Sequence, residues 1–231
     1  IGIQSSDRLH CFEHVTAETL AESEFTAPVR LGLPHPLRGG PALSSVRAAL
    51  APKGRVRISA TTARLFVDLD PGPPEPPLVA LDTVVRSDAA GLERMLGTVL
   101  PHVDEIVLGV DGRSDKETLR VAQALADCVY VFEGADIGLT PEEWTPSEAN
   151  PRGKIDFAAA RNLGRSRVHS PFALVIDSDE YLLRTEDLRA KIKAASDDVD
   201  GFTVVVQMGS FEERDNAQRL ARTKYRWTQA T

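Results

Sequence analysis

Three acidic side chains that follow a short apolar run are the feature of this sequence with the clearest chemistry. The run, Ala-Leu-Val-Ile at residues 173–176, leads directly into Asp177, Ser178, Asp179 and Glu180. A short apolar run with β-branched members predicts a buried strand. If the backbone stays extended beyond it, Asp177 and Asp179 point the same way. A hard divalent cation between them, Mg²⁺ or Mn²⁺, would relieve their repulsion and bind phosphate oxygens. The alternative interpretation is a solvated turn that caps the next helix.

A second acidic residue, Asp111, also follows a predicted strand. Strand and helix patterns alternate from residue 78 onward, and this order predicts an α/β fold with parallel strands and right-handed crossovers. In such sheets the ligand crevice lies outside the carboxyl ends of the strands, so Asp111 and Asp177 are expected at one edge. The expected strands cover residues 78–85, 105–110, 128–132, 172–176 and 201–206, and the expected helices 89–100, 116–125, 156–166 and 186–195.

Length and composition are those of a soluble globular protein with one large or two small domains. The chain has 231 residues, of which 42% are hydrophobic and 26% charged. Its net charge of −7 argues against a broadly basic nucleic-acid-binding face, and no apolar run approaches the ~20 residues that span a bilayer. Cys11 and Cys128 lie far apart in the sequence and are expected to be reduced, which favours a cytoplasmic location. Because the chain starts at Ile1 and stops at Thr231 within a pattern, we expect it to be a fragment.

A proline-rich segment at residues 68–77 predicts a domain boundary. Five prolines in ten residues disfavour helix and interior strand and favour a stiff, extended linker. We expect few contacts to cross this linker, which separates an N-terminal segment, residues 1–67, from a larger domain, residues 78–231. Within the N-terminal segment the patterns predict a helix over residues 43–50, a strand over 55–59 and a loop over 31–41.

Four blocks in the larger domain resemble a family 2 glycosyltransferase of the GT-A fold. Residues 156–162 nearly repeat the family's "DFAAARN", and residues 103–115 are similar to its "VDEIVVVDTGSTD". Residues 84–96 resemble the family's opening strand and helix, and residues 175–180 form its DxD block. The sequence departs from the family pattern at Asp82, inside the first strand, and at Arg113, where the family has a small residue.

The resemblance implies a mostly parallel sheet flanked by helices and a metal-dependent transfer of a sugar. The donor would be a nucleotide-diphospho-sugar, with a UDP-sugar favoured, and the acceptor a glycan, peptide, small molecule or modified nucleic acid. Asp177 and Asp179 would hold Mn²⁺ or Mg²⁺. Arg161 and Asp179 would act in catalysis, because a cation and an arginine stabilise the charge that develops on the departing diphosphate. The donor-binding residues implied by the resemblance are Val84, Arg86, Asp111, Arg161, Asn162, Asp177 and Ser178.

Several of these residues also have a purely structural interpretation. Arg161 could form an ion pair with Asp156 or Glu180 instead of facing the diphosphate. Ser114 and Asp115 could cap the helix that follows them.

An inverting transferase also needs a carboxylate base, which the family places beyond the DxD strand. Glu212, Glu213 and Asp215 lie there in what reads as a polar loop, expected to be mobile without substrate. Residues 218–227 resemble a family stretch that a His-Glu pair usually follows. The base is therefore expected at or after residues 212–231.

Two other functions stay open. A sugar nucleotidyltransferase of the same fold would normally carry a Gly-rich basic loop after the first strand, and residues 86–91 match it poorly. A non-catalytic nucleotide-sugar-binding module is the second alternative. Residues 1–66 faintly resemble the C-terminal half of a class I methyltransferase, but the glycine-rich cofactor loop of that family does not precede them, so no methyl transfer is expected from this segment.

Overall fold

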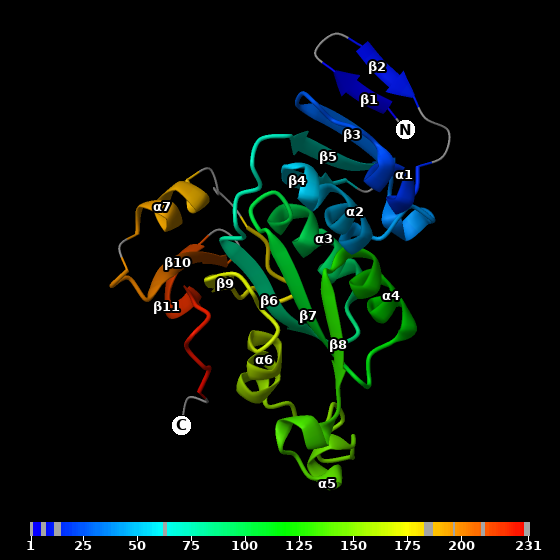
Figure 1. Ribbon diagram of the computed structural model, residues 1–231. Coiled ribbons are helices and arrows are strands. Elements are labelled where there is room, and N and C mark those ends of the chain that lie inside the picture. The colour runs from blue at the N-terminus through cyan, green and yellow to red at the C-terminus, as the bar shows by residue number, and fades with distance from the viewer. Residues whose placement is uncertain are drawn as a thin grey trace.

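The computed structural model describes residues 2–5, 8–11, 15–61, 64–182, 187–195, 197–208 and 211–228. For residues 2–5, 8–11, 203–208 and 211–219 it describes the backbone alone. The described residues form two β-sheets with helices packed against them (Figure 1). Among the helices of this part of the chain, none is both long and apolar enough to cross a membrane.

The larger sheet is mostly parallel, as predicted. Within the described residues it has six strands in the order β10-β11-β9-β6-β7-β8. Strand β6 pairs in parallel with β7 and β9, and β7 pairs in parallel with β8, whereas β11 is antiparallel to both of its neighbours. Strands β6, β7 and β9 are buried almost throughout, as expected where both faces of a sheet are covered, whereas the edge strand β8 is partly exposed. Their bounds are β6 (Val79–Val85), β7 (Glu105–Asp111), β8 (Cys128–Phe132), β9 (Phe172–Leu174), β10 (Gly201–Met208) and β11 (Phe211–Arg222).

Helices cover both faces of this sheet (Figure 1). In β7, Ile106 and Leu108 join the hydrophobic cluster that contains the apolar residues of α3 and α4. Val107, which points the other way, packs in a second cluster with Ala160 of α6. The bounds are α3 (Ala89–Val99), α4 (Lys116–Leu125), α5 (Pro141–Trp144), α6 (Phe157–Arg165) and α7 (Leu188–Ala194), with a 3₁₀ turn η3 (Gly134–Ile137).

Three of these helices begin at an aspartate that caps the first turn. Asp88, Asp115 and Asp156 each accept a hydrogen bond from the backbone N–H three residues ahead, at 3.0, 2.7 and 2.9 Å. Such caps satisfy an N–H that the helix itself leaves unpaired. The capping interpretation of Asp115 is therefore confirmed.

The N-terminal segment forms a separate antiparallel sheet. Its five described strands have the order β2-β1-β3-β5-β4. Alternate residues of β5, such as Leu65 and Val67, are fully buried and share a hydrophobic cluster with the apolar residues of α2. The bounds are β1 (Gly2–Ser5), β2 (Arg8–Cys11), α1 (Ala17–Glu22), β3 (Val29–Pro34), η1 (Pro36–Arg38), α2 (Leu43–Leu50), η2 (Ala51–Lys53), β4 (Arg55–Ala60) and β5 (Arg64–Asp70).

Three strands correct the sequence analysis. Residues 31–34 were expected in a loop but belong to β3, and residues 68–70 were assigned to the linker but complete β5. Residues 212–216 were expected in a mobile loop but belong to β11, where Glu213 pairs with Val206. In each case a neighbouring strand satisfies the backbone hydrogen bonds, and that neighbour cannot be read from local polarity or proline content.

The linker does not isolate the two sheets, so the expectation of few contacts across it is wrong. Residues 71–78 lack regular secondary structure. One hydrophobic cluster nevertheless contains both the N-terminal core and the apolar residues of α3, β6 and β7. Arg47 of α2 forms an ion pair with Asp127 at 3.0 Å, and Arg120 of α4 donates to the carbonyl of Leu37 at 2.9 Å.

Candidate functional site

The loops after β9, β6 and β7 meet at one edge of the larger sheet. These strands are neighbours and run in parallel, so their carboxyl ends lie side by side (Figure 1). The hydroxyl of Thr83 in β6 donates to the carbonyl of Ile176, which holds the chain after β9 close to β6. Asp177 therefore follows the end of β9 and Asp111 is the last residue of β7, so the two lie at one edge as the strand order predicted, and Arg86 follows the end of β6 between them.

Arg161 and Asp177 form the central ion pair of this edge. Arg161 Nη2 lies 2.6 Å from Asp177 Oδ1, and the Asp177 side chain is 43% exposed. The backbone N–H of Asp177 donates to Glu180 at 2.9 Å, which closes the DxD segment into a turn. Arg161 was thus correctly expected at this turn, but its partner is Asp177 rather than Asp156 or Glu180.

Asp179 differs from the other carboxylates of this turn. It is exposed, and among the described residues it has no hydrogen-bond or ion-pair partner. The described residues contain no cluster of three His, Cys, Asp or Glu side chains that could hold a metal by themselves. Mg²⁺ is usually bound by one or two carboxylates together with substrate phosphates and water. The pair Asp177 and Asp179 fits a metal of that kind.

Ser178 connects the DxD turn to the loop after β6. Its hydroxyl donates to Asp88 Oδ2 at 2.8 Å. Ser87, next to Asp88, has the positive backbone angle φ of 45° that few non-glycine residues adopt. Its N–H donates to the Ser114 hydroxyl at 3.3 Å, and its own hydroxyl accepts from the N–H of Asp115 at 3.2 Å. Hydrogen bonds therefore join all three loops of the edge.

Asp111 is fully buried and surrounded by arginine. Arg113 donates to Asp111 Oδ1 from its backbone N–H at 2.8 Å and from Nε at 2.9 Å, and Nη2 reaches Oδ2 at 2.6 Å. Arg86 Nε lies 3.7 Å from the same Oδ2, and burial lowers the pKa of Arg86. Bidentate contact of this kind is the strong form of a charged hydrogen bond. Both carboxylate oxygens of the expected base-binding residue are thus engaged by Arg113.

Arg113 also fixes the segment that contains α5. Its guanidinium lies 3.4 Å from the ring centroid of Trp144 and donates to the Trp144 carbonyl. The same group donates to the carbonyls of Arg152 and Lys154, each at 3.4 Å. Arg113 therefore connects the end of β7 to the segment that follows α5.

Asn162 and Val84 are placed differently from Arg161. The Asn162 side chain donates to the carbonyl of Trp227 at 2.9 Å and accepts from its N–H at 2.8 Å. It therefore attaches the C-terminal segment to α6. Val84 is 6% exposed and packs in the cluster with Val107 and Ala160, so its side chain belongs to the core beneath the site.

Asp82 and Arg165 form a buried ion pair below the edge that the sequence analysis did not anticipate. Asp82 is fully buried, and its Oδ2 lies 3.6 Å from Arg165 Nε. Burial raises the pKa of Asp82 to about 7, although the charge of Arg165 acts in the opposite direction. Neither carboxylate oxygen has a hydrogen-bond partner among the described residues. The aspartate within an otherwise apolar strand was the signal available in the sequence.

The expected catalytic base is not identified among the described side chains. Glu212, Glu213 and Asp215 lie in β11, antiparallel to β10, where the structure describes the backbone alone. Glu13 and His14, from the methyltransferase-like stretch, lie outside the described residues.

The chain matches neither a model of a known protein family nor a curated protein.

Proposed function

We propose that this chain is a metal-dependent glycosyltransferase of the GT-A fold that uses a nucleotide-diphospho-sugar as donor. The observation that carries the proposal is the Arg161–Asp177 ion pair in one turn with Asp179, whose carboxylate has no partner among the described residues, at the carboxyl edge of parallel strands. Ligands of open α/β sheets bind at this edge. The four sequence blocks that resemble family 2 glycosyltransferases support the same assignment.

Each part of the turn has a role in this proposal. Asp177 and Asp179 would hold Mn²⁺ or Mg²⁺, which when bound neutralises charge on the donor diphosphate. Arg161 lies against Asp177, and Asp177 is 43% exposed. From this position the Arg161 guanidinium, on a side chain that is 17% exposed, would stabilise the charge that develops as the sugar departs. Ser178 and Asp88 hold the backbone of the turn in place.

Arg113 changes how the nucleoside would be recognised. Both oxygens of Asp111 accept hydrogen bonds from Arg113, so they are not available to a base in this arrangement. A donor base that contacts Asp111 must displace Arg113, together with its contact to Trp144. Alternatively the base meets the guanidinium of Arg86, which lies at the same strand end and is 25% exposed.

Isothermal titration calorimetry with UDP, GDP and ADP, each with and without Mn²⁺, tests the binding step. We expect one diphosphate to bind in a Mn²⁺-dependent manner. Asp179→Asn should weaken that binding by about tenfold or more, since it removes a charged metal ligand. Glu24→Gln, which alters an exposed carboxylate of the N-terminal segment, is the matched control and should bind as the unaltered chain does. Unchanged affinity in Asp179→Asn would refute the assignment of the metal site.

Turnover separates the proposed transferase from the two alternatives. Release of the nucleoside diphosphate from a nucleotide-sugar in the presence of Mn²⁺ supports a transferase that hydrolyses its donor slowly. Formation of a nucleotide-sugar from a nucleoside triphosphate and a sugar 1-phosphate would identify a nucleotidyltransferase instead. Binding without either reaction would identify a non-catalytic module.

A further inference from the structure

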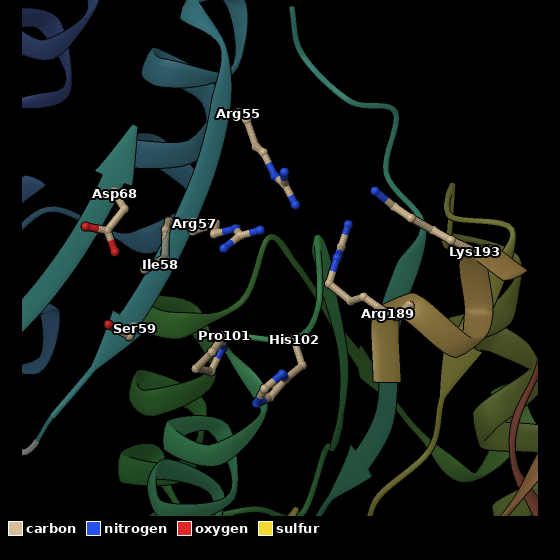
Figure 2. Close-up of a pocket in the computed structure, with 10 residues that line it drawn as sticks. Arg55, Arg57, Ile58, Ser59, Asp68, Pro101, His102, Arg189 and Lys193 are labelled. Atoms are coloured by element: carbon tan, nitrogen blue, oxygen red, sulfur yellow. The ribbon is translucent and has the colours of Figure 1, made fainter. Parts of the chain in front are cut away.

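A pocket lies between the N-terminal sheet and α7, away from the candidate site. Its volume is about 580 Å³, which is typical of sites for small molecules. Pro101 and His102, which line it, belong to the loop that precedes β7 (Figure 2). The pocket is therefore at the amino ends of the parallel strands, whereas the DxD turn is at their carboxyl ends. One small ligand cannot occupy both places.

Four cationic side chains converge on this pocket. Arg55 and Arg57 project from β4 toward Arg189 and Lys193, which project from α7 (Figure 2). Arg55 and Arg57 are two residues apart in a strand and so share one face of the sheet. Polar residues are common on the solvated face of an antiparallel sheet, so Arg55 and Arg57 by themselves are ordinary. Solvation of that sheet does not explain why the α7 cations, Arg189 and Lys193, also point into the pocket.

Three of the four cations have acidic partners at the pocket margin. Glu75 of the linker lies 3.4 Å from Arg55 and 2.9 Å from Lys193. Arg189 lies 2.8 Å from Asp104. The single carboxylate of Glu75 thus pairs with both Arg55 and Lys193, so one of these two positive charges is not compensated by it.

Arg57 supplies a second uncompensated charge. It is exposed, and it has no ion-pair or hydrogen-bond partner in the part of the chain that the structure describes. Its cross-strand neighbour Asp68 is paired with Arg30 at 3.2 Å. Because Asp68 is neutralised by Arg30, the four cations of the pocket are balanced by two carboxylates, those of Glu75 and Asp104, which leaves an excess of two positive charges in a chain whose net charge is −7.

We propose that this pocket binds a small phosphate-bearing ligand with a charge of about two. The guanidinium of Arg57 would contact the phosphate directly, because its planar donors match phosphate oxygens in bidentate geometry. Arg55, from the same strand, and Arg189 and Lys193, from α7 on the opposite wall, would surround the same group. Such a ligand would connect β4 to α7 and so join the N-terminal sheet to the larger domain.

Calorimetric titration with inorganic pyrophosphate tests this inference. The titration uses the Asp179→Asn chain in EDTA at constant ionic strength, so that the metal-dependent site does not respond. We expect saturable binding that Arg57→Gln weakens by about tenfold or more, as the loss of a charged hydrogen-bond donor predicts. Arg94→Gln is the matched control, since Arg94 is an exposed arginine of α3 with no partner among the described residues. It should leave the affinity unchanged.

A second variant tests whether the weaker binding of Arg57→Gln could come from a local structural change at that residue. Lys193→Gln alters the opposite wall and should also weaken pyrophosphate binding, while thermal unfolding confirms that each variant is folded. Absence of saturable binding in the Asp179→Asn chain would overturn the proposal. Equal weakening by Arg57→Gln and Arg94→Gln would also overturn it, because binding would then reflect diffuse charge. Neither result bears on the glycosyltransferase assignment, which depends on the other edge of the sheet.

Discussion

Replacing Asp82 with asparagine should stabilise the protein in a manner that depends on pH. Asp82 is fully buried under the candidate site and lies 3.6 Å from Arg165, and its pKa is raised from 3.8 to about 7. A carboxyl whose pKa is raised by folding holds its proton more tightly in the folded state. The stability that protonated Asp82 contributes to the folded state is therefore fully present below pH 3.8 and is lost as the pH rises through about 7.

The size of the effect follows from the two pKa values. Each unit of difference corresponds to about 1.4 kcal/mol, so the shift of Asp82 costs the folded state on the order of 4 kcal/mol above pH 7. Asparagine resembles the protonated carboxyl in shape and carries no charge at any pH. The free energy of unfolding of Asp82→Asn should therefore be close to that of the unaltered chain near pH 4 and exceed it increasingly up to about pH 7, where the difference levels off.

Urea-induced unfolding followed by circular dichroism, at several pH values between about 4 and 8, measures this difference. Glu148→Gln is the matched control, because the Glu148 side chain is exposed and forms no hydrogen bond or ion pair with the described residues. It should change the free energy of unfolding by less than about 0.5 kcal/mol at every pH. A difference between Asp82→Asn and the unaltered chain that stays constant with pH would refute the reasoning. A variant that is less stable at pH 8 would show that the attraction to Arg165 outweighs the cost of burial.

Three further substitutions test the packing of the site. Arg113→Ala should lower the free energy of unfolding by about 3 kcal/mol, because it leaves the buried carboxylate of Asp111 without its main partner; a loss below about 1 kcal/mol in chemical denaturation would contradict this. Gly109→Ala should cost about 2 kcal/mol, since a Cβ there would lie 2.5 Å from the Tyr130 hydroxyl; an unchanged melting temperature would show that the ring moves aside freely. Asp115→Ala should cost about 1 kcal/mol through loss of the α4 cap, and Asp115→Asn should restore most of it; equal losses in both would argue for a role other than capping.

The parallel part of the larger sheet could be predicted from the sequence because its signals are local. Strands β6 to β9 are short apolar runs, and the helices between them carry apolar residues at helical spacing and begin at aspartate caps. The alternation of strand and helix then determines that the carboxyl ends lie together. That reasoning predicts Asp111 and Asp177 at one edge of the sheet, whereas Arg161 was expected there only from the family resemblance.

The antiparallel strands could not be predicted in the same way. Strand β5 ends inside a proline-rich segment, β3 ends at Pro34, and β11 contains five charged residues in its first nine, residues 211–219. Each is a strand because a neighbour pairs with its backbone, and that pairing depends on segments distant in the sequence. Local composition therefore indicated loops where the structure has strands.

The sequence by itself determined which carboxylates and arginines follow the strands of the parallel sheet, and tertiary structure decided which of them have partners. Arg113 is two residues from Asp111, yet only the fold shows that it holds both carboxylate oxygens and Trp144. The pocket cations of β4 lie more than 130 residues before those of α7 in the sequence, and they are neighbours only because α7 packs beside β4 (Figure 2). The physical reason is that ion pairing and burial depend on distance in space, which the spacing of residues along a chain does not determine.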